Sequence, residues 1–342
     1  MKASMKSLLL SVLISLTTQA FAFDRQALMQ AYFGVVMIQG YNQEGGLTYG
    51  SGVVVAKDEV ITNCHVLRTT NRPWVARGQN SYEITSVKAD TWNDLCLVTT
   101  ENLPLKPVQL GKSSHLKRGE EVTGMGHSNG APAPLTSTGF VNGLYSDTQS
   151  NGKVIRTNAK FRMGASGSGL FDMDGRLVGI NTFKTAGKHG SIHFALPIEW
   201  LELLEKQSAI TKFPIKGKAL WEEDEDKKPF YMQAAVPESR GDWPKLMQVA
   251  NNWIKVDPNS PDAWYALGLS EENLGDIETA TKHYLQSSSL DADNMDVLIK
   301  IGELAKTRGD KAELTRVHAA ITKIDADIGQ QYQQFVDCSI EC

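Results

Sequence analysis

Short apolar runs separated by turn-forming residues fill the chain between residues 30 and 200, and they limit the folds open to this region. Most runs are four to six residues long and rich in Val, Ile and Leu, and Gly, Pro, Asn or Asp residues separate them. Runs of this kind are typical of the strands of an all-β barrel or sandwich. Examples of the expected strands are 34–38, 52–55, 60–62, 95–99, 121–125, 177–180 and 192–195.

Two further segments complete this β-rich region. Residues 105–115 show no periodicity, so they are suited to connect two halves of the region. A helix is expected from residue 197 to about 208, because Trp200, Leu203 and Leu204 recur at helical spacing.

A repeat with a period of 34 residues follows the β-rich region. The pair Gly-Asp recurs at 241/242, 275/276 and 309/310. Small and apolar residues also recur around it, and a period of this length resembles tetratricopeptide repeats, in which stacked helical hairpins share a core. The repeats imply an all-α region over 229–330. We expect Pro237 to interrupt the first helix of the first copy. The matching positions are Trp264, Leu267, Gly268, Ala280, Tyr284 and Ala292, and then Leu298, Ile301, Gly302, Leu314, His318 and Ala326.

The first 22 residues have the composition of a secretory signal peptide. Lys2 and Lys6 form a positive start, residues 8–16 are apolar, and Ala20-Phe21-Ala22 is a small-x-small cleavage site. The apolar stretch is too short to span a membrane. The sequence therefore predicts a periplasmic or secreted protein that begins at Phe23 and has no membrane span.

Charge divides the chain into two parts. Residues 23–220 carry 21 Lys and Arg against 16 Asp and Glu, whereas residues 221–342 carry 12 against 23. Neither part has the basic stripe that a nucleic-acid partner needs. The charged run 221–228 is typical of a solvated linker. The predicted division is a signal peptide at 1–22, a β domain at 23–208, a linker at 209–228, repeats at 229–330 and a tail at 331–342.

The chain has four cysteines, and an even number in an exported protein favours disulfides. Three pairings are possible, of which we favour Cys64–Cys96 and Cys338–Cys342. A metal site is less favoured, because Cys64 and His65 are neighbours on a predicted strand and would face opposite sides. We expect neither a metal nor another cofactor.

Three residues with complementary chemistry follow one another along the β-rich region. Ser166 lies in the run Gly-Ala-Ser-Gly-Ser-Gly at 164–169, His65 follows Ile-Thr-Asn-Cys, and Asp94 lies in Asn-Asp-Leu. A serine becomes a good nucleophile when an imidazole takes its proton, and a carboxylate must hold that imidazole in one tautomer. The order His, Asp, Ser predicts such a set. Asp90 competes with Asp94 for the role of the carboxylate.

These segments resemble the trypsin-fold serine peptidases, and most closely the bacterial HtrA/Deg-like branch. The resemblance rests on five motifs and runs over about 34–206. It implies two six-stranded β-barrels with an active site between them, so the expected fold class is an all-β double barrel followed by an all-α repeat region. The motifs are 50–55 (Gly-Ser-Gly-Val-Val-Val), 61–66 (Ile-Thr-Asn-Cys-His-Val), 93–95, 164–167 and 177–181 (Leu-Val-Gly-Ile-Asn).

The resemblance also implies roles for individual residues. Ser166 would be the nucleophile, His65 the general base and then the general acid, and Asp94 the residue that orients the imidazole. The backbone N–H groups of Gly164 and Ser166 would form the oxyanion hole. Asp94 is preferred to Asp90, because an apolar strand follows it directly, as the family pattern expects.

The substrate-binding residues are less closely defined. The resemblance places Thr182, Phe183 and Lys184 along the substrate backbone, with the Thr182 hydroxyl beside Asp94. Lys160 falls near the floor of the specificity pocket and His193 at its border. A basic pocket would favour acidic side chains, whereas a Lys160 that points to solvent would not, and both alternatives stay open.

The sequence as a whole predicts an exported serine endopeptidase that cleaves protein substrates through a Ser-His-Asp triad. The repeats would bind substrate, a protein partner or a second copy of the chain. The alternative is an inert or latent barrel that leaves the repeats to act as a binding module, but relatives of that kind typically lose the Ser or the His. A small-ester hydrolase is disfavoured, because residues 164–171 lead into a turn and a strand rather than a helix.

Overall fold

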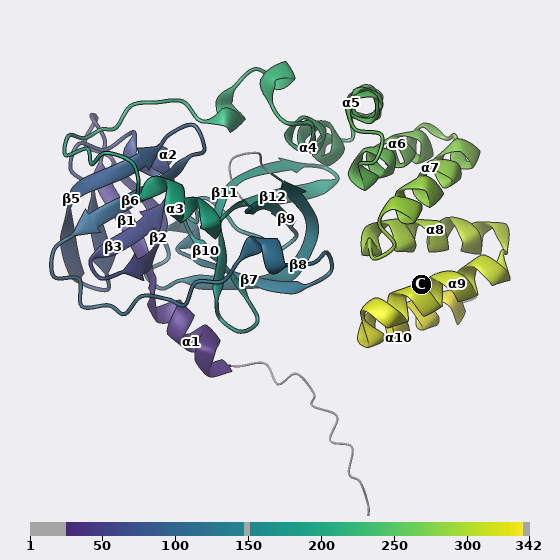
Figure 1. The fold of residues 1–342 in the computed structure, drawn as a ribbon, viewed down its shortest axis with the longest axis horizontal. Coiled ribbons are helices and arrows are strands. Elements are labelled where there is room, and N and C mark those ends of the chain that lie inside the picture. The colour runs from purple at the N-terminus through teal and green to yellow at the C-terminus, as the bar shows by residue number, and fades with distance from the viewer. Residues whose placement is uncertain (1–24, 147–150, 338–342) are drawn as a thin grey trace, which may run out of the picture.

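Two closed β-barrels and a row of helices make up the protein (Figure 1). The computed structural model describes residues 25–146 and 151–337. The first barrel has the strand order β1-β2-β3-β6-β5-β4, and the second has the order β10-β11-β12-β9-β8-β7. The fold class expected from the sequence, a double barrel followed by an all-α region, is therefore confirmed. The predicted signal peptide and the predicted Cys338–Cys342 bridge lie outside the described residues.

The strands of the two barrels are consecutive along the chain. Those of the first barrel are β1 (Val35–Tyr41), β2 (Leu47–Ala56), β3 (Glu59–Thr62), β4 (Trp74–Arg77), β5 (Asn80–Asp90) and β6 (Leu95–Thr100). Those of the second are β7 (Glu121–Gly126), β8 (Leu135–Ser146), β9 (Lys153–Thr157), β10 (Gly169–Asp172), β11 (Leu177–Gly187) and β12 (Gly190–Pro197). All seven expected strands fall within or across these elements, although β2 and β11 are much longer than expected.

Buried β-branched and aliphatic side chains explain why the short runs form barrels. Val36, Val54 and Val98 belong to a core cluster inside the first barrel, and Leu170 and Ile155 to one inside the second. A larger cluster runs from both barrels into the first helices of the all-α region. The barrels and the helices are therefore joined by continuous apolar packing, which is the main driving force for folding.

Two local expectations were wrong. His65 and Cys64 do not lie on a strand, because β3 ends at Thr62 and the short helix α2 (Cys64–Leu67) begins. The Cys64 N–H donates to the Asp94 carbonyl rather than to a neighbouring strand. The helix expected over 197–208 is also shorter: a 3-10 turn at Ile198–Trp200 leads into α3 (Leu201–Leu204).

The Gly-Asp pairs mark the turns between paired helices. Each glycine ends a helix in the left-handed conformation, with φ of 72° at Gly241, 95° at Gly275 and 70° at Gly309. The aspartate that follows each of them caps the next helix by accepting a hydrogen bond from the backbone three residues on. The helices, preceded by α1 (Arg25–Phe33) at the start of the described chain, are α4 (Phe230–Arg240), α5 (Trp243–Val256), α6 (Pro261–Leu274), α7 (Ile277–Leu290), α8 (Met295–Arg308), α9 (Lys311–Ile324) and α10 (Ala326–Asp337).

Pro237 lies inside α4 and does not interrupt it, contrary to expectation. Because proline has no N–H, α4 lacks the hydrogen bond that position 237 would make to the carbonyl four residues earlier, and the helix nevertheless continues to Arg240. None of the helices in the described part of the chain is both long and apolar enough to cross a membrane.

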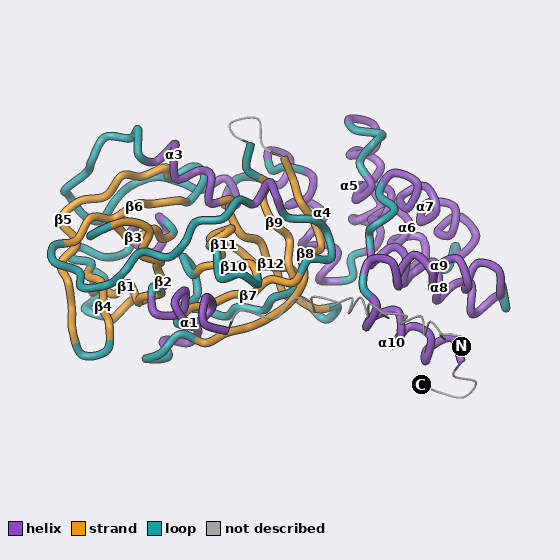
Figure 2. Tube along the Cα trace, turned by 60° about the horizontal axis from the view of Figure 1, so that its bottom comes forward, coloured by secondary structure: helices purple, strands orange, loops and turns teal. Residues whose placement is uncertain are grey.

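The helices lie beside the second barrel, at one end of the molecule (Figures 1 and 2). Arg156 of β9 forms a two-pronged ion pair with Glu238 of α4, with a shortest distance of 2.6 Å between Nη2 and Oε1. Arg118 pairs with Asp262 of α6, and the ring of Tyr145 stacks on Tyr231 of α4 with 4.3 Å between centroids. The first helices are thus fixed on the barrel that carries Ser166.

The disulfide Cys64–Cys96 is present and joins α2 to β6 across a sequence separation of 32 residues. We expect a variant with both cysteines replaced by Ser to be less stable by about 3–4 kcal/mol, because the bridge closes a loop of that length in the unfolded chain. Chemical denaturation with and without reductant measures this. Reductant should destabilise the natural protein more than the variant, and an equal response of the two would contradict the assignment.

His193 of β12 is 1% exposed, and its ring packs on Phe161 with 4.7 Å between centroids. Burial, followed by the nearby Lys184 charge, lowers its pKa from 6.5 to about 4. Between pH 6.5 and 4 His193 is protonated in the unfolded chain but not in the folded protein. The free energy of unfolding therefore falls as the pH falls through this window, by about 3 kcal/mol in all.

Unfolding free energies between pH 7 and 4 test this assignment for His193. His193→Phe should flatten the loss of stability toward low pH, leaving the part due to His127, whose pKa burial also lowers. The same slope in the variant and the natural protein would show that His193 is not the group responsible.

Candidate active site

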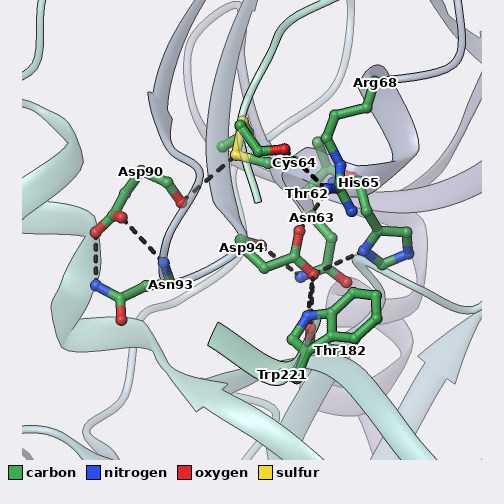
Figure 3. The surroundings of a disulfide bond; sticks show 12 residues. Thr62, Asn63, Cys64, His65, Arg68, Asp90, Asn93, Asp94, Thr182 and Trp221 are labelled. Atoms are coloured by element: carbon green, nitrogen blue, oxygen red, sulfur yellow. Dashed lines mark hydrogen bonds and ion pairs between the residues drawn. A yellow bond between two sulfur atoms is a disulfide. The ribbon is translucent and has the colours of Figure 1, made fainter. Parts of the chain in front are cut away.

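A short hydrogen bond joins His65 to Asp94 (Figure 3). The distance from His65 Nδ1 to Asp94 Oδ2 is 2.7 Å, and the His65 backbone N–H donates to the other carboxylate oxygen, Oδ1, at 2.8 Å. Asp94 is 1% exposed, whereas the His65 side chain keeps 24% of its surface exposed. The carboxylate is therefore buried behind an imidazole that remains open on its far side.

The turn before β6 places the Asp94 side chain. Asp94 has a φ of +57°, which is unusual for a residue with a side chain. Asp90, the competing carboxylate, accepts hydrogen bonds from the backbone and the side chain of Asn93, at 3.0 and 2.7 Å. Asp90 therefore holds the turn, and the carboxylate that faces His65 is Asp94.

Two further side chains donate to the same oxygen, Asp94 Oδ2. The Thr182 hydroxyl lies at 3.0 Å, beside Asp94 as the sequence led us to expect. The Trp221 indole N–H donates at 3.1 Å and comes from the segment expected to be a solvated linker. Four donors thus surround the carboxylate, counting the two from His65, and fix its orientation.

Ser166 lies in a turn that only small residues can form. Gly164 and Gly167 have φ of +87° and +84°, and a Cβ on Gly164 would lie 2.5 Å from the Tyr49 ring. Ser51 of the first barrel holds this turn through two hydrogen bonds. Its N–H donates to the Ser166 carbonyl and its hydroxyl to the Gly164 carbonyl, both at 2.8 Å.

The N–H groups of Gly164 and Ser166 point away from neighbouring acceptors. The carbonyl before Gly164, that of Met163, accepts from the Asn129 N–H, and the carbonyl before Ser166 accepts from the Ser168 N–H. Because N–H and C=O point in opposite directions across a trans peptide, both amides face the other way. Neither amide donates a hydrogen bond within residues 25–146 and 151–337. Two adjacent unpaired donors of this kind can bind a negatively charged oxygen.

His65 and Ser166 line one cavity of about 320 Å³. The expected substrate-binding residues Thr182, Phe183 and Lys184 also line it. Lys160 and His193 do not appear in its lining: Lys160 is exposed, and His193 is buried against Phe161. The remaining residues of the lining are Thr185, Trp221, Lys228, Met232 and Val236.

Several site residues were missed from the sequence. Met232 and Val236 belong to α4, and Trp221 and Lys228 to the segment before it, so the wall of the cavity includes residues beyond the barrels. A tryptophan at the head of the charged run 221–228 is the one sequence signal, because a solvated linker has little use for a large aromatic side chain. Ser51 was noted in a motif but given no role.

Comparisons with known proteins show what part of this chain is similar to. The "Trypsin-like peptidase domain" family matches residues 50–180. "Serine protease HTR4" of Bos taurus is 36% identical over 189 residues, which cover 50% of this chain and 36% of the bovine protein. "Probable periplasmic serine endoprotease DegP-like" of Ectopseudomonas mendocina is 33% identical over 166 residues, which cover 47% of this chain and 35% of that protein. The chain thus matches only about a third of the length of these relatives.

Among solved structures, the active form of the Rv3671c protease from M. tuberculosis is 22% identical, with a TM-score of 0.48. That match covers 64% of this chain and 99% of the other. The family match contains His65, Asp94 and Ser166, the three residues whose order first suggested a nucleophilic serine. Residues 50–180 match the trypsin-like peptidase domain family, and HtrA-type serine proteases are among the proteins to which this chain is similar.

Proposed function

We propose that this protein is a serine endopeptidase that hydrolyses peptide bonds of protein substrates. The observation that carries the proposal is the pairing of His65 with the buried Asp94 carboxylate at 2.7 Å, in a cavity that Ser166 also lines. The N–H groups of Gly164 and Ser166, which have no acceptor among the described residues, support it further, because acyl transfer needs donors for a developing oxyanion. The curated relatives named above support the same reaction class.

The proposed reaction assigns one step to each group. Ser166 Oγ attacks the carbonyl carbon of the scissile bond while His65 Nε2 takes the hydroxyl proton, and the Gly164 and Ser166 N–H groups bind the oxyanion. His65 then gives the proton to the leaving amine, and an acyl-enzyme remains. Water, deprotonated by His65, hydrolyses that ester and restores Ser166. Asp94 stabilises the charged imidazole throughout.

The substrate chain is proposed to lie along residues 182–184 of β11. This stretch follows the part of β11 that pairs with β10, which ends at Ile180. Phe183, Met232 and Val236 give the cavity apolar walls, and α4 closes it on the side of the helices. The Lys184 ammonium group donates to the Phe161 carbonyl at 3.1 Å, so an internal contact already uses part of its hydrogen-bonding capacity. An apolar side chain next to the scissile bond therefore suits this cavity best.

Export and partner binding extend the proposal beyond the barrels. We propose that residues 1–22 direct export to the periplasm or medium, which the Cys64–Cys96 bridge supports, because disulfides persist in oxidising compartments. N-terminal sequencing of the exported product should begin at Phe23.

We also propose that the tetratricopeptide-like helices bind a protein partner or substrate. Cross-links from a Ser166→Ala variant to captured protein should fall on α5–α9 rather than on the first barrel.

Labelling with a fluorescent fluorophosphonate, which reacts with activated serines, tests the proposed nucleophile. The oxidised protein should be labelled, and Ser166→Ala should abolish the labelling. Ser168→Ala is the matched control, since Ser168 lies two residues away, is 1% exposed and accepts a hydrogen bond from Asn181. Absence of labelling in the folded natural protein would contradict the proposal and favour an inert barrel whose repeats bind other proteins.

Substitution of Gly164 tests the proposed oxyanion hole. Gly164→Ala should slow labelling by about 10²–10³-fold, because the methyl group clashes with Tyr49 and displaces the N–H donor. Gly275→Ala is the control: it also has a positive φ, of +95°, but its added Cβ has no atom within 4 Å. Equal labelling rates for both variants would show that the Gly164 turn is not needed for the chemistry.

A further inference from the structure

The segment that leaves the β domain returns to His65 and Asp94 before α4 begins. Trp221 of this segment donates its indole N–H to Asp94 Oδ2 at 3.1 Å, the oxygen that His65 Nδ1 also contacts. The Trp221 and His65 rings meet edge to face, with centroids 5.5 Å apart and planes at 88° (Figure 3). One side chain thus contacts both members of the pair.

Residues 217–222, which we call the strap, are fixed on α2 by an ion pair. Arg68, at the end of α2, donates to both carboxylate oxygens of Glu222, at 2.6 and 2.8 Å, and to the Gly217 carbonyl at 3.0 Å. Glu222 also accepts from the Ala219 N–H at 2.8 Å. The two hydrogen bonds from the Arg68 guanidinium group hold the pKa of Glu222 below its ordinary value. Because His65 lies three residues before Arg68, one short helix carries both the imidazole and the anchor of the strap.

The strap is also fixed on the turn that carries Asp94. The Leu220 N–H donates to the Trp92 carbonyl at 2.8 Å, two residues before Asp94. Gly217 packs so closely on Thr91 that an added Cβ would lie 2.3 Å from the Thr91 hydroxyl. The strap therefore bridges the two segments whose relative position sets the distance between His65 and Asp94.

From this arrangement we propose that Trp221 is a positioning residue for the Asp94–His65 pair, held in place by the Arg68–Glu222 ion pair. The indole N–H fixes Asp94 Oδ2 in the direction of His65 Nδ1, and the ring edge limits rotation of the imidazole. Trp221 lines the cavity and so lies next to the proposed substrate, rather than packing inside a hydrophobic core. The inference rests on the proposed peptidase function and adds a residue outside both barrels to it.

Trp221→Phe removes the N–H donor and keeps an aromatic ring beside His65. The second-order rate constant for labelling by the fluorophosphonate should fall about tenfold or more, because a hydrogen bond to a charged group is lost. The acidic limb of the plot of this rate constant against pH should move to higher pH. With one donor fewer on its carboxylate, Asp94 stabilises the protonated form of His65 more strongly. The other charged groups around the pair are unchanged: Arg68 and Glu222 on one side, and Lys184 and Lys228 in the cavity wall.

Trp264→Phe is the matched control, because the Trp264 indole N–H donates to the Pro258 carbonyl in the helical region, away from the site. It should label at the natural rate with an unchanged pH profile. Circular dichroism and the melting temperature establish that both variants are folded. If Trp221→Phe is unfolded, Glu222→Gln replaces it, since loss of the charged partner of Arg68 should free the strap and lower the labelling rate constant. Because the Glu222 charge also acts on His65, only the rate is read for this variant.

The outcomes separate this inference from the proposed function. Labelling that depends on Ser166, with the same rate and pH profile in folded Trp221→Phe as in the natural protein, would overturn the role of Trp221 alone. Where Glu222→Gln replaces that variant, an unchanged labelling rate has the same meaning. In Trp221→Phe, a lower rate at every pH without a shift of the acidic limb would also overturn it, because that result indicates loss of packing. No labelling of the natural protein would remove the proposed function and this inference together.

Discussion

The hydrogen bonds that converge on the Asp94 carboxylate are the constraint on which the site depends. A buried carboxylate is costly unless donors surround it, and this one has four, from His65, Thr182 and Trp221. The three residues come from α2, from β11 of the second barrel and from the strap. The need to satisfy one buried group therefore draws together parts of the chain that are far apart in sequence. It also leaves the imidazole oriented toward the cavity that Ser166 lines.

The second requirement is a rigid turn at Ser166, and the first barrel supplies part of it. Ser51 of β2 holds the carbonyls of Gly164 and Ser166. The carbonyls that precede these two residues are held by Asn129 and Ser168. With all of these carbonyls engaged, the N–H groups of Gly164 and Ser166 are directed away from the protein's own acceptors. Within the described part of the chain, these two donors are thus left unpaired by the packing between the barrels.

Local patterns predicted the fold well, because strand runs and helix turns are encoded by neighbouring residues. The Gly-Asp pairs located the helical hairpins, since Gly241 and Asp242 form a helix end and the next cap by themselves. The order of His65, Asp94 and Ser166 indicated a catalytic set, and a family resemblance supplied their roles and added Thr182. Trp221 was missed because its partner lies 127 residues earlier in the chain, and no local pattern reports such a contact. The same holds for Met232 and Val236, whose helix looked like part of a separate array.

Asp94 is at the centre of the proposed chemistry, and Asp94→Asn tests its role most directly. Asn keeps the shape of the side chain and can keep the fold, but it reverses the hydrogen bond to His65 Nδ1 and so favours the wrong tautomer. We predict that the rate of fluorophosphonate labelling at Ser166 falls by about 10³–10⁴-fold in protein that circular dichroism shows to be folded. A folded Asp94→Asn protein that is labelled at the natural rate would contradict the proposed role of Asp94.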